Sequence, residues 1–477
     1  MDAKELAFAG IAEQARLIDS GQVSSRELVE LYIERIERFD SDVKAFRVLF
    51  AEQALEQARA VERTRTSGGG GPLLGVPVAV KDDTDVAGQV TAMGSNAFGG
   101  PATEDAEIVK RLRAAGAIII GKTNVPELCM WPFTETVAWG STRNPWDLQR
   151  APGGSSGGSG AAVAAGLVGA ATGSDGAGSI RIPSAWCGLF GCKTQRGRVP
   201  GSGGWHGMSV NGLLGRNVAD TALFLDVLGS SAGPAGGDGA SSSTSFVQAA
   251  AEGRAAEASA GGRRRLRICF SKRIPPGILT TLDSDAERCL MNSVELLRSL
   301  GHTVEERDPD YPAQMLPALL VRMFCGIADE ARQMARPARL ERRTRAMARI
   351  GTLIPRSALR WSFEREGEIA ARLNAVLSSH DVLITPATAK PPPPLGQFEG
   401  AGALRTFNGV ARLVPFNAPW NLTGQPACSV PAGFGADGLP RAIQLVGRAS
   451  DERTLLALAA ELEREQRWPE LRPARFA

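Results

Sequence analysis

Residues 105–124, DAEIVKRLRAAGAIIIGKTN, contain the pattern that decides the fold class. The first half has apolar residues at helical spacing and ends at a glycine, which predicts an amphipathic helix and its stop. The second half, AIIIG, is a short β-branched run typical of a buried strand. A similar run, LLGVPVAVKDD at 73–83, precedes the helix. Strand, helix and strand in this order predict an α/β protein with a parallel or mixed sheet.

The flanking segments extend this pattern in both directions. SSRELVELYIERIERFD at 24–40 begins with capping serines and repeats apolar residues along one stripe, so residues 1–65 are predicted to be mostly helical. Towards the C-terminus we expect a strand at 265–271, a long Arg-rich helical region over 313–380 and a strand at 381–388. The chain should end as strand, turn, strand and helix.

Two Ser/Gly-rich stretches have different neighbours. Residues 230–262 hold almost no large apolar side chain, which predicts a flexible surface insertion. Residues 152–160, PGGSSGGSG, instead lead into small residues at helical spacing, which predicts a closely packed helix rather than a linker. We therefore expect one domain over 1–477, made of an N-terminal helical part (1–65), a catalytic core (66–229), the insertion (230–262) and a C-terminal part (263–477).

The composition excludes several classes of protein. The chain has 477 residues and a net charge of +3, with 54 basic and 51 acidic residues, so no strong field points to nucleic acid or an anionic membrane. Seven scattered cysteines and three histidines show no disulfide framework or zinc spacing, which favours a reducing cytoplasm and no metal. We see no signal-peptide pattern, and no apolar window reaches the roughly 20 residues that cross a bilayer.

Two motifs for other chemistries lack their structural context. GAIIIGKT at 116–123 matches the phosphate-loop pattern, but its variable positions are the predicted strand itself, with Lys122 at its end. GGSSG at 153–157 matches the nucleophile elbow of α/β-hydrolases, but a polar, turn-rich loop precedes it instead of an apolar strand. We favour a buried strand for the first motif and keep a non-enzymatic nucleotide-binding protein as an alternative.

A serine-based reaction can be assembled from separate segments. Serine is a poor nucleophile without a base, and because histidine is scarce, lysine is the available base. Lys81 ends a predicted buried strand, where desolvation would lower its pKa. Ser179 follows Gly176, Ala177 and Gly178, whose N–H groups can converge on an oxyanion. An ordinary strand-end lysine and a simple Gly-rich turn are the alternatives for these segments.

These segments together resemble the amidase signature family. The resemblance rests on GVPVAVKD, PGGSSGGSG and GSDGAGSIRIPSAWCGLFGCK, with GKTNVPEL and STRNPWD between them, and it covers nearly the whole chain. It implies a single large α/β/α domain, with a central mixed, mostly parallel sheet covered by helices on both faces. It also implies hydrolysis of carbon–nitrogen amide bonds without a cofactor.

The resemblance implies a role for each motif residue. Ser179 would be the nucleophile, Ser155 the bridging serine and Lys81 the base, with a cis peptide bond between Gly154 and Ser155. The oxyanion would be held by the backbone N–H groups of Gly176, Ala177, Gly178 and Ser179. The loop would be supported by Ser156, Asp175 and Arg181. Many relatives have two glycines where this chain has Ala177-Gly178, from which we expect an altered pocket shape.

The resemblance defines the substrate less closely. LCMWPFTETVAWG at 128–140 holds Met130, Trp131 and Phe133, which predict an apolar, aromatic-lined pocket unless they pack in the core. Residues 200–215 and 313–360 should supply the rest of that pocket. We expect a stand-alone amidase for hydrophobic or aryl amides, with carbamates (urethanes) and esters as further substrates. The alternative is a glutaminase subunit of an amidotransferase.

The expected partners are correspondingly few. A small-molecule amide or carbamate is the expected substrate, and we expect neither nucleic acid nor membrane as a partner. The chain should act as a monomer or homodimer.

Overall fold

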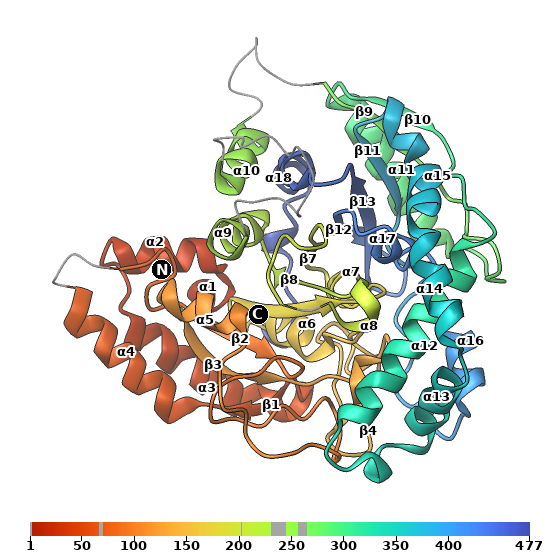
Figure 1. Cartoon of the computed structure of the whole chain (residues 1–477). Helices are drawn as coiled ribbons and strands as arrows, with labels where there is room; N and C mark the ends of the chain where they lie inside the picture. Colours follow the sequence, from red (N-terminus) through yellow and green to blue (C-terminus); the bar gives the residue numbers. More distant parts are fainter. Residues whose placement is uncertain (1, 66–69, 202, 230–244, 256–264) are drawn as a thin grey trace.

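The computed structural model describes residues 2–65, 70–201, 203–229, 245–255 and 265–477. A single sheet of 11 strands runs through them (Figure 1), in the order β1-β3-β2-β6-β8-β7-β12-β13-β11-β9-β10. These strands are β1 (Phe46–Leu49), β2 (Pro77–Lys81), β3 (Ile118–Thr123), β6 (Ala170–Asp175), β7 (Phe190–Lys193), β8 (Val210–Gly215), β9 (Arg267–Phe270), β10 (Thr303–Glu306), β11 (Val382–Pro386), β12 (Ala427–Phe434) and β13 (Pro440–Gly447). A separate short pair is formed by β4 (Glu135–Thr136) and β5 (Gly140–Ser141).

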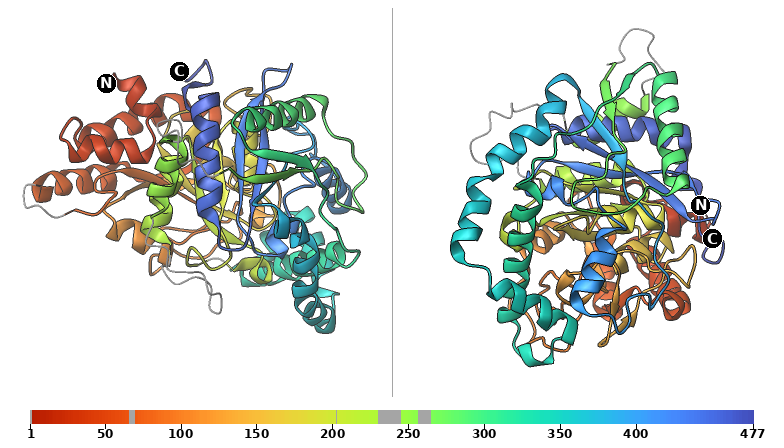
Figure 2. Two further views of the ribbon diagram at one scale, coloured as in Figure 1. Left: turned by 90° about the horizontal axis from the view of Figure 1, so that it is seen from above. Right: turned by 90° about the vertical axis from the view of Figure 1, so that its right-hand side faces the viewer.

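The helices cover this sheet and extend beyond it. They are α1 (Ala3–Phe8), α2 (Ile11–Asp19), α3 (Ser25–Val43), α4 (Ala51–Arg65), α5 (Glu107–Ala114), α6 (Gly157–Ala164), α7 (Arg181–Cys187), α8 (Gly204–Gly207), α9 (Val218–Leu228), α10 (Phe246–Ala255), α11 (Ser284–Ser299), α12 (Met315–Gln333), α13 (Arg342–Thr352), α14 (Arg356–Glu364), α15 (Glu366–Ser379), α16 (Ala403–Ala411), α17 (Pro419–Leu422) and α18 (Glu452–Gln466). The N-terminal helices and the α12–α15 region lie on opposite sides of the molecule (Figures 1 and 2).

The predicted strand, helix and strand are β2, α5 and β3. Strands β2 and β3 are parallel, with Pro77 opposite Ile118 and Lys81 opposite Thr123, and both are buried along their whole length. A strand that is buried on both faces has a continuous run of apolar residues, so these two strands could be located from the sequence alone. The sequence GAIIIGKT therefore forms a buried strand rather than a phosphate loop.

The sheet is mixed, as predicted, but parallel pairs are not the majority. Among the described strands, four neighbouring pairs of the large sheet are parallel and six are antiparallel. Strands β12 and β13, for example, are joined by the short turn 435–439. Parallel neighbours need a crossover of about a dozen residues or more, so such a turn enforces antiparallel pairing.

Helices pack on both faces of the sheet, as β13 shows. Ile443 and Leu445 belong to the larger hydrophobic core, which includes side chains of α11 and α18. Ala442 and Val446 belong to separate clusters on α7 and α12. Successive side chains of a strand point to opposite faces, so this alternation places helices on either side.

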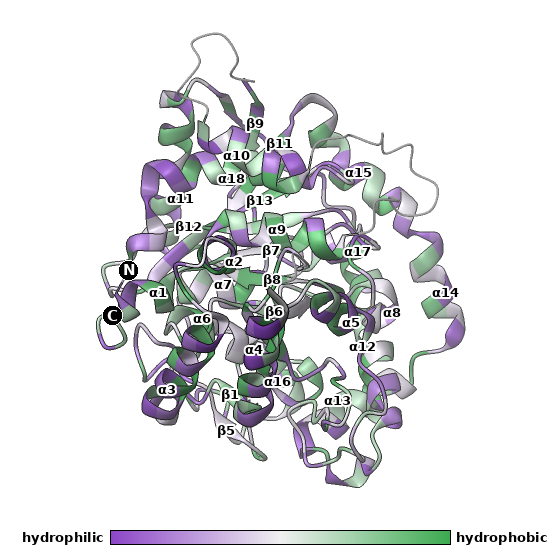
Figure 3. Cartoon of the chain, turned by 90° about the vertical axis from the view of Figure 1, so that its left-hand side faces the viewer, coloured by the Kyte–Doolittle hydropathy of each residue, from purple (hydrophilic) through white to green (hydrophobic). Residues whose placement is uncertain are grey.

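The N-terminal helical part has the predicted amphipathic character. Helix α3 buries Leu28, Tyr32 and Ile36 and begins with a capping box between Ser24 and Glu27. Its hydrophilic residues are visible along the ribbon in Figure 3. The capping box satisfies two backbone N–H groups that would otherwise lack partners, which fixes where the helix starts.

The predicted flexible insertion at 230–262 is partly wrong. Residues 230–244 and 256–264 lie outside the described residues, but helix α10 lies between them and packs on α9 and α18. A Cβ on Gly253 would lie 2.1 Å from the Ala457 carbonyl oxygen. A helix that packs this closely needs small residues, so its composition resembles that of a linker.

Within the described part of the chain, no helix has the length and apolar character of a membrane span. The same residues contain no group of three or more His, Cys, Asp or Glu side chains arranged to hold a metal ion.

Candidate active site

The segment 152–160 is held rigidly by its surroundings. All nine of its residues are buried, and the Gly154–Ser155 peptide bond is cis, as predicted. Gly153 has a φ of 102°, a region that side chains with a Cβ rarely adopt. A Cβ on Gly154 would lie 2.5 Å from the Trp131 carbonyl oxygen. The glycines therefore allow close packing, and the segment is not a linker.

Lys81, at the end of β2, connects the predicted motifs. Its side chain is fully buried, and its Nζ donates hydrogen bonds to Ser155 Oγ (2.8 Å) and Ser174 Oγ (2.7 Å). The Asp83 carboxylate lies 3.2 Å from the same nitrogen. Strands β2 and β6 are parallel neighbours, so the ends that carry Lys81 and Ser174 meet at one edge of the sheet.

The expected lowering of the Lys81 pKa is wrong. Burial is the largest single influence and would lower the pKa of Lys81, but Asp83, with smaller contributions from Cys129 and Asp175, raises it above the ordinary lysine value. Desolvation alone gives the wrong direction, because the Asp83 carboxylate, two residues further along the chain, also acts on Lys81. The Asp83 carboxylate thus favours the protonated form of Lys81 in the resting site.

Ser179 lies between β6 and α7 and is half-buried. The Ser156 backbone N–H donates a hydrogen bond to the Ser179 carbonyl oxygen (3.2 Å), and the Ser156 hydroxyl donates to the Ser174 carbonyl oxygen (3.4 Å). Among the described hydrogen bonds none joins Ser155 Oγ to Ser179 Oγ, but both residues line one cavity. These two hydrogen bonds of Ser156 hold the segment that contains Ser155 against the segment that contains Ser179.

A buried ion pair supports the Ser179 loop. Arg181 donates to both carboxylate oxygens of Asp175, at 2.8 and 3.0 Å, and both side chains are fully buried. Burial alone would raise the pKa of Asp175, but the Arg181 charge holds it well below its usual range. A paired, fully hydrogen-bonded carboxylate can remain charged in the interior. The pair is internal, not the solvent-facing pair that sequence alone left open.

This arrangement changes the predicted oxyanion hole. The Gly178 N–H donates a hydrogen bond to Asp175 Oδ1 at 2.7 Å, so it is already occupied. The N–H groups of Gly176, Ala177 and Ser179 donate no hydrogen bond among those described. Of the four predicted oxyanion donors, these three therefore stay candidates, whereas the Gly178 N–H is engaged because Asp175 folds back onto its own loop.

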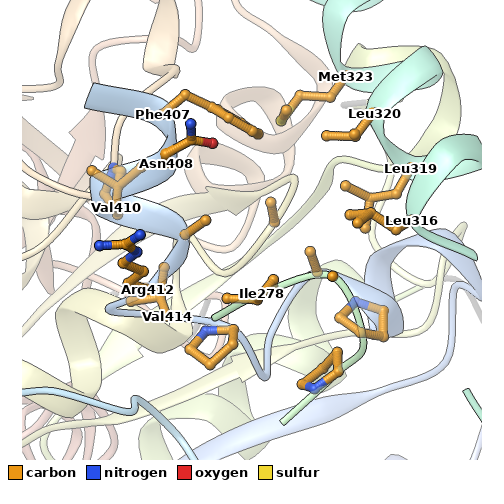
Figure 4. A pocket seen from close by; sticks show the side chains of 18 of the residues that line it. Ile278, Leu316, Leu319, Leu320, Met323, Phe407, Asn408, Val410, Arg412 and Val414 are labelled. Atoms are coloured by element: carbon orange, nitrogen blue, oxygen red, sulfur yellow. The ribbon is translucent and has the colours of Figure 1, made fainter. Parts of the chain in front are cut away.

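An apolar cavity of about 490 Å³ opens beside Ser179. Met130 and Trp131 line it as predicted, together with Trp205 and Met347 from the two expected segments. In Figure 4, side chains of α12 face those of α16 across the cavity, and Ile278 lies below them. The labelled lining residues are Ile278, Leu316, Leu319, Leu320, Met323, Phe407, Asn408, Val410, Arg412 and Val414.

The assignment of Phe133 to this pocket is wrong. Its ring is 1% exposed and stacks between Trp131 and Phe398, with ring centroids 6.0 and 5.2 Å away. Phe133 supports Trp131 from behind and does not line the cavity. Of the two alternatives for Phe133, pocket lining and core packing, its contact with Phe398 decides for core packing.

Sequence reasoning missed Asp83 and Ser174, although both lie close to residues that it singled out. Ser174 accepts a hydrogen bond from Lys81 and donates one to Asp83. Both are polar residues at or just beyond the ends of buried strands, and that pattern was the available signal.

A family model described as Amidase matches residues 27–456. The chain belongs to the amidase signature family. The resemblance inferred from its motifs is thereby confirmed, and amide hydrolysis is the reaction class of the family.

Relatives and solved structures agree with this assignment. The Mycobacterium tuberculosis protein named "Putative amidase AmiB2" is 48% identical over 477 residues, covering 99% of this chain and all 100% of the relative. The 6-aminohexanoate-cyclic-dimer hydrolase of Paenarthrobacter ureafaciens is 32% identical, covering 96% of this chain and 95% of the relative. A bacterial aryl acylamidase of the same family superposes with a TM-score of 0.83 at 26% identity, covering 98% of each chain.

Proposed function

We propose that this amidase acts alone on hydrophobic or aryl amides through an acyl-enzyme on Ser179, with Ser155 and Lys81 relaying the proton. The observation that carries the proposal is the buried 2.8 Å contact between Lys81 Nζ and Ser155 Oγ, beside a serine that lines an apolar cavity. A nucleophile, a relay and a base in one chain match the requirements of covalent serine catalysis.

The reaction begins when Ser179 Oγ attacks the substrate carbonyl carbon. The Ser179 proton passes to Ser155, and the Ser155 proton passes to Lys81 after Lys81 has lost its own proton. The N–H groups of Gly176 and Ala177, together with that of Ser179, stabilise the negative charge on the carbonyl oxygen. The proton then returns through Ser155 to the leaving nitrogen, the carbon–nitrogen bond breaks, and water hydrolyses the acyl-enzyme.

The apolar lining supports a hydrophobic acyl group. Burying a side-chain-sized apolar group contributes about 1.5–3 kcal/mol to binding. Similarity to an aryl acylamidase and to a hydrolase of a cyclic amide supports the same class of substrate. Carbamates and esters have the same electrophilic carbonyl and are proposed as secondary substrates. A glutaminase subunit would need a polar site for glutamine, whereas most residues that line this cavity are apolar.

A panel of 4-nitroanilides of acetate, hexanoate and phenylacetate tests the proposal with the purified chain. We expect release of 4-nitroaniline with a preference for the two larger acyl groups. Ser179→Ala should reduce kcat/KM by about 10⁴-fold or more, because members of a catalytic unit fail together. An acyl adduct on Ser179, detected by mass spectrometry, would confirm the nucleophile.

Ser184→Ala is the matched control. Ser184 lies on α7, and its buried hydroxyl has no hydrogen-bond partner among the described residues. Removing that hydroxyl should leave activity within about twofold of wild type. Full activity in Ser179→Ala would refute the proposed nucleophile.

A further inference from the structure

Ser179 lines two cavities that differ in character. The apolar cavity lies on one side, and a polar cavity of about 260 Å³ lies on the other. Ser155 and Ser179 both line the polar cavity, whereas Ser155 is absent from the described lining of the apolar one. The two cavities therefore meet at the nucleophile, but only one of them reaches the proton relay.

This difference assigns each half of a substrate to one cavity. In the proposed reaction Ser155 returns the proton to the leaving nitrogen, which must therefore lie within hydrogen-bonding reach of its hydroxyl. The leaving amine consequently occupies the polar cavity, and the acyl group occupies the apolar cavity. Both halves contact Ser179, whose oxygen forms the new bond.

The polar cavity is acidic. Among its described lining residues there is no Lys or Arg, and the carboxylates are Asp83, Asp85, Glu107 and Glu330. Three of these four pair with a cation or accept a hydrogen bond from a hydroxyl group. Asp83 pairs with Lys81 (3.2 Å), Glu107 pairs with Arg111 (2.8 Å), and Asp85 accepts a hydrogen bond from a threonine hydroxyl (2.6 Å).

Glu330 differs from the other three. It lies on α12, and its Oε2 is buried without a hydrogen-bond partner among the described residues. Burial raises the pKa of Glu330 to about 8, and a contact with the Trp205 side chain only partly offsets this. A buried carboxyl group without a cation therefore keeps its proton near neutral pH, and a bound ligand that supplies a positive charge would favour its ionised form.

We propose that the polar cavity is the leaving-group subsite and that Glu330 makes it selective for amines that carry a second, cationic nitrogen. The substrate class is then an apolar acyl group joined by an amide bond to a short diamine. This inference rests on the proposed amide hydrolysis. Glu330 acts as a specificity residue that binds the distal ammonium group while the acylated nitrogen remains near Ser155.

Three hexanamides with side chains of similar size test the selectivity in the wild-type enzyme. N-(2-Aminoethyl)hexanamide carries a distal ammonium, N-propylhexanamide a methyl group, and N-hexanoylglycine a carboxylate. We expect kcat/KM to fall in that order, with at least about tenfold between the cationic and neutral amides, since a hydrogen bond to a charged group supplies such a ratio. Hexanoate release, measured by liquid chromatography and mass spectrometry, is common to all three.

Glu330→Gln separates selectivity from intrinsic reactivity. The ratio of kcat/KM for the cationic amide to that for the neutral amide should fall about tenfold in this variant, because the side-chain shape is kept and the charge is lost. Asp329→Asn is the matched control. Asp329 is the neighbouring residue on α12, is 38% exposed and pairs with His206 and Arg332, so its removal should leave the ratio unchanged.

The outcomes distinguish this inference from the proposed function. If the wild-type enzyme cleaves neither these amides nor any 4-nitroanilide, the proposed function fails. If it cleaves them without preferring the cationic amine, or if Glu330→Gln keeps the wild-type ratio, only the leaving-group assignment is refuted. The wild-type ranking decides the question even where Glu330→Gln does not fold.

Discussion

Two buried lysines at the ends of neighbouring strands have pKa values that are shifted in opposite directions. Lys81 ends β2 and Lys122 is the penultimate residue of β3, both side chains are fully buried, and each pairs with an aspartate. Burial lowers the pKa of Lys122, whereas Asp83 raises that of Lys81. Two residues alike in local sequence have thus acquired different charge environments.

Their remaining partners explain the difference. Lys122 Nζ contacts Asp82 (3.0 Å), which also pairs with Arg47 (2.6 Å). The same nitrogen of Lys122 donates hydrogen bonds to a threonine hydroxyl and a backbone carbonyl. Lys81 instead contacts two serine hydroxyls, both of which belong to residues that line the polar cavity with Ser179. A buried lysine is a candidate base where its hydrogen bonds lead to a nucleophile, and a structural cation where they lead only into the fold.

The largest expected effect separates the two lysines by activity. Lys81→Ala should reduce kcat/KM for a 4-nitroanilide by about 10⁴-fold, because the relay loses its final acceptor. Lys122→Ala should retain activity close to wild type at a temperature where it is folded. Comparable losses in both variants, measured at equal folded fraction by circular dichroism, would contradict the distinction.

The next effect concerns stability. Lys122→Ala leaves Asp82 with one cation instead of two, and we expect a loss of about 3 kcal/mol in the free energy of unfolding. Denaturant titration followed by fluorescence measures this loss. Lys122→Met keeps most of the side-chain volume and should lose less than Lys122→Ala, so an equal loss would show that packing does not contribute.

The smallest effect is a shift in pH dependence. In the proposed reaction neutral Lys81 is the base, so kcat/KM should rise with pH as the ammonium form loses its proton. Asp83→Asn removes the charge that raises the pKa of Lys81, and the rising limb should therefore move to lower pH. Asp82→Asn, the equivalent change beside Lys122, should leave the limb where it is. A shift toward higher pH in Asp83→Asn would refute the role of Asp83.

Sequence reasoning succeeded where local constraints are strong. Strands β2 and β3 were recognisable because burial on both faces demands continuous apolar runs. The cis bond before Ser155 followed from the family resemblance, and the dense glycines around it are explained by backbone contacts too close for a Cβ.

It failed where a contact that forms only in the folded chain decides the outcome. The ring of Phe133 packs against Phe398, far along the chain, and helix α10 packs against α18. Gly178 lost its expected role because a nearby carboxylate folds back onto the loop. None of these partners can be identified from composition or periodicity alone.

The sequence by itself determined which reactive groups are available, because the hydroxyl of a serine, the amine of a lysine and the N–H groups of a glycine-rich loop are fixed by residue type. Only the tertiary structure decided their electrostatic surroundings and the cavities that they line. Lys81 and Ser174 are 93 residues apart in sequence but 2.7 Å apart in space. Electrostatic interactions depend on distance and burial, so the properties of Lys81 and the separation of the two cavities exist only in the folded chain.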